Sequence, residues 1–282
     1  IETDLTVVCI DKDHFRIISS AATRERDKFH IKKHLTKDVE LKDVTDDFCV
    51  FGVFGPKSRD LMKSISKDNF ENSNFRFGTA KYIMIEGIKI WTQRLSYVGE
   101  LGYELYVKSE EAKKIYELLI NKGKDFNLSN CGMHAMDIMR MESGFLHWGH
   151  DISPEENQYQ AGLSFTISSK KEDEFIGKKA LEKIKKEKIK SRFAMFTLKD
   201  TKPGEPLLLH DEPIYLENNI IGRSTSGNYS FNFKKNLAFG YINNDISNDE
   251  LHKKDLFIEV EKKKYPIEII NKPLKQTNFK NN

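Results

Sequence analysis

The segment from Tyr97 to Val107 combines carboxylates, tyrosines and glycines in a way that suits the binding of a polar ligand. In a strand that begins at Tyr103, alternation places Tyr103, Leu105 and Val107 on one face. Glu104 and Tyr106 then lie together on the opposite face. A carboxylate beside an aromatic ring loses part of its hydration, so Glu104 requires a cation or hydrogen-bond donors in exchange. Two interpretations follow: a salt bridge to Lys or Arg within the protein, or a bound ligand that supplies the donors.

A second set of polar side chains stands at the start of the chain. Residues Ile1 to Val8 alternate like a strand, which places Asp4 and Thr6 on the same face. A turn at Asp11 to Asp13 and a returning strand at Phe15 to Ile18 complete a predicted hairpin. Because the sequence opens within this pattern and without Met, we expect further residues to precede it in the native polypeptide.

A third region whose side chains could take part in chemistry consists of a predicted helix, Cys131 to Gly144, and a following loop that contains histidines. Asp137 and Arg140 lie three residues apart, a spacing that predicts an ion pair on the helix. The loop from His147 to Asp151 has the composition of a metal triad, but no helix or strand fixes its geometry. We therefore expect a polar loop packed over Trp148 and no metal site.

Composition narrows the classes of function. The chain has 282 residues, 38% of them hydrophobic, and a net charge of +3, which favours a globular protein and argues against a nucleic-acid partner. No apolar run is long enough to span a membrane, so no membrane association is expected. The cysteines Cys9, Cys49 and Cys131 are far apart and lack CxxC spacing. Reduced thiols in the cytoplasm, or in the mitochondrial matrix of a eukaryote, are therefore expected.

The stretch Gly52-Val53-Phe54-Gly55, part of a predicted buried strand that ends at Gly55-Pro56, precedes a predicted helix. It lacks the Gly-Lys-Ser/Thr ending of a phosphate loop, and no GxGxxG run occurs. We therefore expect no nucleotide or flavin to bind at this stretch.

The order of the predicted elements indicates the α+β class, with several mixed α/β lobes. Short strands are predicted before the strand at Tyr103, the last of them at Leu95 to Val98. Glu86-Gly87 predicts a tight turn between two of these strands.

Short strands also recur after residue 190 between turn signals, and they predict a small antiparallel β domain. We expect a core over residues 1–170, a lysine-rich linker helix over 171–190 and the β domain over 191–282.

Six motifs occur in the order and at the spacing of a known family, and together they span nearly the whole chain. They are Ile1-Glu2-Thr3-Asp4-Leu5-Thr6-Val7, Phe54-Gly55-Pro56-Lys57-Ser58-Arg59, Tyr97-Val98-Gly99-Glu100-Leu101-Gly102-Tyr103-Glu104-Leu105-Tyr106, His147-Trp148-Gly149-His150-Asp151, Phe175-Ile176-Gly177-Lys178-Lys179-Ala180-Leu181, and Thr225-Ser226-Gly227 with Leu237-Ala238-Phe239-Gly240-Tyr241. In these motifs the chain resembles the glycine-cleavage T-protein (aminomethyltransferase) family, and within it the C-terminal tetrahydrofolate half of dimethylglycine and sarcosine dehydrogenases.

The resemblance implies a cloverleaf of lobes around a folate pocket, ending in a β-barrel-like domain. It implies that Asp4 is the catalytic carboxylate near the reactive folate nitrogens, with Thr6 beside it as a cofactor-binding residue. Tyr97 and Glu104 match the family's folate-contacting tyrosine and pterin-binding glutamate. Arg140 matches the motif at the end of the central helix, which makes it a further expected cofactor contact.

One departure from the family pattern favours the dehydrogenase branch: Met136 stands where aminomethyltransferases commonly carry an arginine. For that branch the resemblance implies the capture, by tetrahydrofolate, of a methylene or formaldehyde equivalent from an oxidised N-methyl amine of the dimethylglycine or sarcosine type. The product is 5,10-methylenetetrahydrofolate. FAD is then expected only on an upstream half or on a partner oxidoreductase subunit.

Two alternatives remain. One is a stand-alone aminomethyltransferase that takes its carbon from a lipoyl carrier protein. The other is a non-catalytic folate-binding protein of the iron–sulfur-assembly branch. Residues 147–160 lack the cysteine of that branch's motif, which argues against the second alternative.

Overall fold

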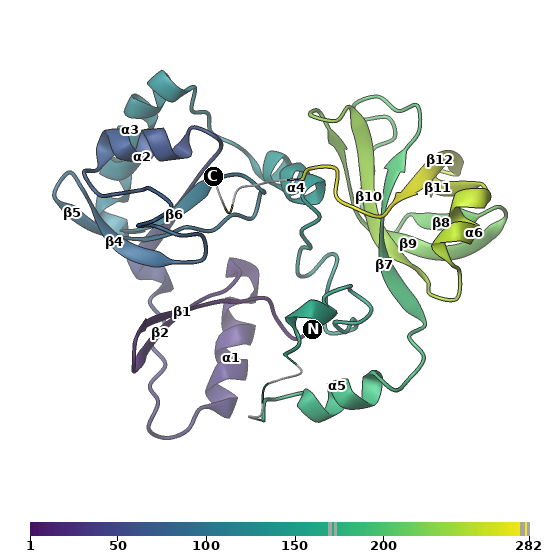
Figure 1. Cartoon of the computed structure of the whole chain (residues 1–282), viewed down its shortest axis with the longest axis horizontal. Coiled ribbons are helices and arrows are strands. Elements are labelled where there is room, and N and C mark those ends of the chain that lie inside the picture. Colours follow the sequence, from purple (N-terminus) through teal and green to yellow (C-terminus); the bar gives the residue numbers. More distant parts are fainter. Residues whose placement is uncertain (169–170, 172–173, 277–279, 281–282) are drawn as a thin grey trace. The chain divides into compact units, whose positions relative to one another are not determined.

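The structure is a computed structural model that describes residues 1–168, 171, 174–276 and 280, and it divides into two compact units (Figure 1). The sheet unit contains residues 4–136 and the described residues among 276–282, and the barrel unit contains residues 1–3 and 137–275. The division falls within helix α4 (Met133–Glu142). Residues 170 and 282, the predicted ends of the core and of the C-terminal domain, lie outside the described residues.

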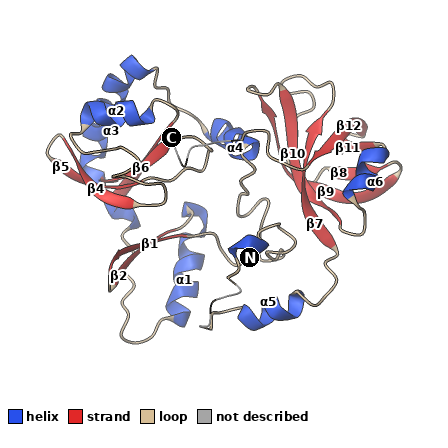
Figure 2. Ribbon diagram, viewed as in Figure 1, coloured by secondary structure: helices blue, strands red, loops and turns tan. Residues whose placement is uncertain are grey.

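A four-stranded antiparallel sheet in the order β3-β6-β5-β4 forms the centre of the sheet unit (Figure 2). Its strands are β3 (Phe48–Phe54), β4 (Ala80–Ile85), β5 (Ile88–Gln93) and β6 (Gly102–Lys108). The tight turn between β4 and β5 is confirmed. Glu86 and Gly87 have φ angles of 49° and 78°, the pair of left-handed conformations that a two-residue hairpin turn of type I′ requires.

One face of this sheet is buried beneath the helices α2 (Ser58–Ile65) and α3 (Ala112–Gly123) (Figure 2). Tyr103, Leu105 and Val107 of β6 are fully buried there. The core on this face also contains Leu61, Met62, Phe70, Phe75, Ile83, Ile90, Ile115 and Leu119. The alternation predicted for β6 is therefore confirmed, and its even-numbered side chains face away from this core.

Residues 95–98 do not form a strand, contrary to the prediction. The strand β5 ends at Gln93, and after it the Oγ atom of Ser96 accepts a hydrogen bond from the backbone N–H of Glu100 at 3.0 Å. A side chain that bonds a nearby backbone group offers the chain an alternative to a strand ladder. The segment between β5 and β6 is therefore a loop.

The predicted N-terminal hairpin is present as β1 (Thr6–Asp11) and β2 (His14–Ile18), with Thr6 opposite Ile18. Its first strand begins at Thr6 and not at Ile1, so Asp4 precedes the strand, contrary to the prediction. The hairpin leads into helix α1 (Arg24–His34). Both elements belong to the sheet unit.

In the barrel unit, the β domain predicted after residue 190 is a closed antiparallel barrel in the order β10-β7-β12-β11-β8-β9 (Figure 2). Its strands are β7 (Ser191–Leu198), β8 (Pro213–Leu216), β9 (Asn219–Ser230), β10 (Lys235–Asn243), β11 (Leu256–Val260) and β12 (Lys263–Ile270), and the helices of this unit are α5 (Lys178–Ile184) and α6 (Asn248–Lys253). Gly222 and Gly240 allow β9 and β10 to approach closely, because a Cβ at either position would meet a backbone oxygen of the facing strand. The predicted fold class, α+β with a C-terminal barrel, is confirmed.

A buried ion pair anchors the loop after α4 within the barrel unit. Arg140 is 1% exposed and Asp151 is fully buried, and the Nη1 atom of Arg140 lies 2.5 Å from Oδ2 of Asp151. Asp151 also accepts hydrogen bonds from the hydroxyls of Thr225 and Ser226 and from the backbone N–H of His147. All acceptor positions of this carboxylate are thus directed at protein donors, which makes its role structural.

We expect Asp151→Ala to destabilise the protein by roughly 3–5 kcal/mol, because it leaves the Arg140 guanidinium buried without its main counter-charge. Urea unfolding measures this loss. Glu155→Ala, an exposed carboxylate in the same loop, is the matched control and should change stability by no more than about 0.5 kcal/mol. Equal effects of the two substitutions would show that the buried pair does not hold the loop.

Candidate functional site

The outer face of the four-stranded sheet carries four polar or aromatic side chains in two adjacent rows. In the first row Gln93 of β5 lies opposite Glu104 of β6, and in the second Trp91 lies opposite Tyr106. Residues paired directly across an antiparallel ladder point to the same face, with Cβ atoms about 4.5–5.5 Å apart. We call these four residues the outer-face cluster.

Glu104 accepts one hydrogen bond from within this cluster. The Oη atom of Tyr106 donates to its Oε2 atom at 2.8 Å. Partial burial raises the pKa of the Glu104 carboxyl, and the hydrogen bond from Tyr106 opposes that rise. Within the described part of the chain Glu104 forms no ion pair, so the salt-bridge interpretation finds no partner there.

Three aromatic rings hold the β1–β2 hairpin against this side of the sheet. The guanidinium carbon of Arg16, on β2, lies 5.4 Å from the ring centre of Phe48, 5.2 Å from that of Trp91 and 5.9 Å from that of Tyr106. Each such contact is worth about 0.5–1 kcal/mol when exposed and more when desolvated. Burial and the neighbouring Glu104 raise the pKa of Tyr106. This phenol therefore remains a hydrogen-bond donor at neutral pH.

The expected folate-site residues fall in both units. Asp4 is exposed just before β1, and Thr6 is the half-buried first residue of β1. Tyr97 is half-buried in the loop that leads from β5 to Glu104 on β6. These four residues belong to the sheet unit. Because β2 pairs with β1 and also contacts the outer-face cluster through Arg16, the hairpin that begins at Thr6, shortly after Asp4, is held on the side of the sheet that presents Glu104.

Arg140 belongs to the barrel unit, and protein acceptors surround its guanidinium. The predicted ion pair with Asp137 is present at 2.7 Å. The remaining donors reach Asp151, the carbonyl oxygen of Phe145 and the hydroxyl of Ser226. A folate contact by Arg140 stays a prediction.

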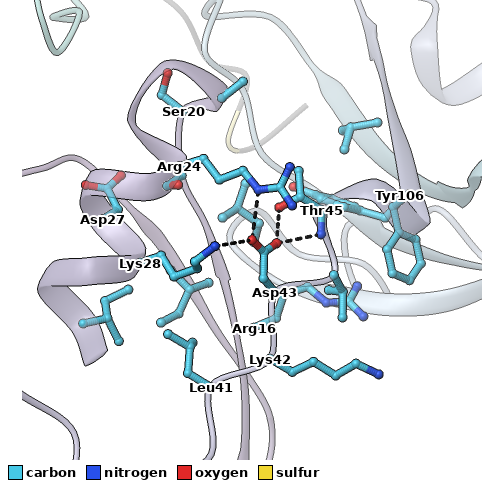
Figure 3. A pocket seen from close by; sticks show the side chains of 18 residues that line it. Arg16, Ser20, Arg24, Asp27, Lys28, Leu41, Lys42, Asp43, Thr45 and Tyr106 are labelled. Carbon is cyan, nitrogen blue, oxygen red and sulfur yellow. Dashed lines mark hydrogen bonds and ion pairs between the residues drawn. The ribbon is translucent and has the colours of Figure 1, made fainter. Parts of the chain in front are cut away.

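A cavity of about 320 Å³ adjoins the cluster in the sheet unit, and Figure 3 shows its lining. It lies between β2, α1 and the segment 41–45, and Tyr106 forms part of its wall. Asp43 accepts hydrogen bonds there from Arg24 at 2.9 Å, from Lys28 at 3.3 Å and from the hydroxyl of Thr45 at 2.8 Å. The Arg24 guanidinium holds the pKa of Asp43 well below its usual range. Both cations are thus already paired.

Gln93, Trp91 and Arg16 are residues of this region that the sequence did not single out. The strand β5 runs from Ile88 to Gln93, so Gln93 is its last residue. A correct register for β5 and β6 would have revealed that Gln93 faces Glu104, but the register depends on the length of the loop between them.

The His147–Asp151 loop is not arranged as a metal site in the structure. Asp151 points inward to Arg140, and no group of three or more His, Cys, Asp or Glu side chains among the described residues could hold a metal ion.

Comparison with known proteins agrees with this fold. The family model described as "GCVT N-terminal domain" matches residues 1–171, and that described as "Glycine cleavage T-protein C-terminal barrel domain" matches residues 192–275. The chain belongs to the glycine cleavage T-protein family, whose members are aminomethyltransferase-like. The resemblance inferred from the six sequence motifs is confirmed.

Relatives of this chain include both long and short proteins. Mitochondrial dimethylglycine dehydrogenase of Homo sapiens is 32% identical over 276 residues, which are 96% of this chain and 31% of the relative. An aminomethyltransferase of Halothermothrix orenii is 31% identical over 86% of this chain and 66% of the relative. The chain therefore spans less than a third of the length of the human dehydrogenase.

A solved structure has the same fold. The crystal structure of glycine cleavage system aminomethyltransferase T from Bartonella henselae matches with a TM-score of 0.81 at 20% identity, over 97% of this chain and 72% of that chain.

In the portion of the chain that the structure describes, no helix combines the length and apolar character needed to cross a membrane.

The raised pKa of Glu104 predicts a pH-dependent effect on stability. Between the ordinary glutamate pKa of 4.5 and the higher value in the folded state, the folded protein keeps a proton that the unfolded chain has lost. Stability is therefore lost as the pH rises through this window. We expect Glu104→Gln to gain stability relative to the wild type at pH 7, and this advantage should shrink at pH 4.

Urea unfolding of both proteins at the two pH values measures the effect. The exposed Glu110→Gln controls for the loss of a carboxylate from the same unit. A Glu104→Gln variant that is less stable than the wild type at pH 7 would contradict the inference that partial burial of the charged Glu104 carboxylate costs free energy.

Proposed function

We propose that this chain performs a tetrahydrofolate-dependent one-carbon transfer. In the proposed reaction a methylene or formaldehyde equivalent from an oxidised N-methyl amine, of the dimethylglycine or sarcosine type, is captured to give 5,10-methylenetetrahydrofolate. The observation that supports it most is Glu104, a half-buried carboxylate to which a single described side chain, Tyr106, donates a hydrogen bond. Membership of the glycine cleavage T-protein family supports the same ligand class.

Glu104 fits the pterin ring through its unused acceptor capacity. A carboxylate offers about four lone-pair sites, and Tyr106 uses one of them. A reduced pterin presents a ring N–H and an adjacent exocyclic amine, which a carboxylate accepts in parallel. Such a ligand would replace the hydration that Glu104 loses by partial burial, and it would favour the ionised form of the carboxyl.

In this proposal Asp4 and Tyr97 act on the other parts of the ligand. When bound, tetrahydrofolate supplies the ring and side-chain nitrogens that accept the one-carbon unit. Asp4, an exposed carboxylate, takes up a proton from these nitrogens and stabilises positive charge as it develops. Thr6, the first residue of β1, and Tyr97, in the loop before β6, supply binding contacts.

The source of the carbon defines the alternatives. In the first candidate, for which the dehydrogenase relative is the support, a flavin on an upstream half or on a partner subunit oxidises the amine. The aminomethyltransferase relative of which it spans 66% supports a second candidate, transfer from a lipoyl carrier protein. Flavin absorbance in the full native protein would favour the first candidate, and methylene transfer from a loaded lipoyl carrier protein would favour the second.

We expect the native protein to bind tetrahydrofolate, and we expect Glu104→Gln to weaken binding roughly ten- to a hundredfold, because hydrogen bonds to charged groups contribute about 1.5–3 kcal/mol. Isothermal titration calorimetry at pH 7 measures both affinities. Glu100→Gln alters a glutamate in the neighbouring loop and should leave the affinity unchanged. Absence of binding by the wild type would rule out a folate-dependent function for this chain.

We expect Asp4→Asn to lower turnover by about a hundredfold or more, the usual contribution of a positioned acid–base group, while most tetrahydrofolate affinity is retained. Formation of 5,10-methylenetetrahydrofolate by the full native protein, in parallel with calorimetry, separates the two quantities. Asp11→Asn, at the far end of β1, is the matched control and should have normal turnover. Wild-type turnover in Asp4→Asn would exclude its assignment as the catalytic carboxylate.

A further inference from the structure

Gln93 carries a buried hydrogen-bond donor that the fold does not use. The side chain is 1% exposed, and its Nε2 atom has no hydrogen-bond partner among the described residues. An amide nitrogen removed from water without a partner costs free energy, so such groups are rare unless they serve a purpose. Glutamine also loses considerable side-chain entropy on burial, which adds to the cost.

The position of this donor relative to Glu104 is set by the sheet. Gln93 and Glu104 are paired in register on β5 and β6, so their side chains stand next to each other on the outer face. A hydrogen bond between them would satisfy both groups, yet Glu104 receives its hydrogen bond from Tyr106 instead. The fold therefore presents an unused donor beside a carboxylate with unused acceptor sites.

We infer that Gln93 is a second polar contact for the ligand that Glu104 binds, and that it donates a hydrogen bond to a carbonyl oxygen on the ligand. This inference rests on the proposed function. Together the two side chains are complementary to a planar heterocycle whose edge carries two donors followed by an acceptor: an amine, a ring N–H and a carbonyl. A 2-amino-4-oxo pterin has such an edge, and a 2,4-diamino analogue does not.

A purely structural role for Gln93 predicts a different outcome. If the amide supported the fold, its replacement would lower stability. If the donor is held for a ligand, replacement by an apolar side chain of similar size removes an unsatisfied group, and stability is unchanged or higher while affinity falls. The signs of the two effects distinguish these roles.

The test is Gln93→Met in the full native protein, with Thr92→Val as the matched control. Thr92 is the preceding residue of β5, points to the opposite face and also carries a buried hydroxyl without a partner among the described residues. We expect the dissociation constant for tetrahydrofolate to rise roughly tenfold in Gln93→Met, with an unchanged or higher unfolding midpoint. Thr92→Val should keep the wild-type affinity.

Binding of the reduced 2,4-diamino analogue locates the contact on the ligand. If Gln93 donates to the 4-carbonyl, the preference of the wild type for tetrahydrofolate over this analogue should fall roughly tenfold in Gln93→Met. Equal weakening of both ligands would overturn the assignment to the carbonyl. Wild-type affinity in Gln93→Met, or a loss of affinity together with lower stability, would overturn the ligand contact while the role of Glu104 stands. If the wild type does not bind tetrahydrofolate, the proposed function itself fails.

Discussion

The candidate site owes its geometry to the in-register pairing of β5 with β6. Because side chains alternate along a strand, a slip of one residue would turn Glu104 into the core and Tyr103 out of it. Full burial of Tyr103, Leu105 and Val107 prevents this slip, since each large apolar side chain contributes about 1.5–3 kcal/mol when buried. The core thus determines the orientation of β6, and Glu104 is held on the outer face as a consequence.

Two carboxylates illustrate how similar chemistry leads to different roles. Asp151 is completely buried, and it accepts hydrogen bonds from Arg140, Thr225, Ser226 and the backbone of His147. Glu104 is less buried, but among the described side chains it accepts a hydrogen bond from Tyr106 alone. The number of donors, and not burial by itself, separates a carboxylate that stabilises the fold from one whose acceptor sites the described side chains leave unused.

The β1–β2 hairpin, which begins at Thr6 shortly after Asp4, is joined to the sheet by cation–π contacts. Arg16 lies over three rings from β3, β5 and β6, and these rings are brought together by strand pairing. Two carboxylates that differ in exposure, the exposed Asp4 and the half-buried Glu104, belong to the same compact unit. The barrel unit uses its own arginine, Arg140, to fix the loop after α4.

Features that depend on local periodicity and turn chemistry could be predicted from the amino-acid sequence alone. Alternation along β6 predicted that Glu104 and Tyr106 share a face, the Glu86-Gly87 pair predicted a hairpin turn, and recurring short strands predicted an antiparallel β domain after residue 190. Motif order identified the family. These properties are readable because each depends on residues close together in the chain.

Which distant residues meet became clear only in the folded protein. Residues 95–98 form a loop, because Ser96 bonds the backbone of Glu100, and Gln93 faces Glu104 across the sheet. Asp151 turns inward to Arg140, for which the spacing along α4 had predicted Asp137 as a partner. Strand register and the direction of a loop side chain follow from the packing of the whole unit, so local sequence patterns do not specify them.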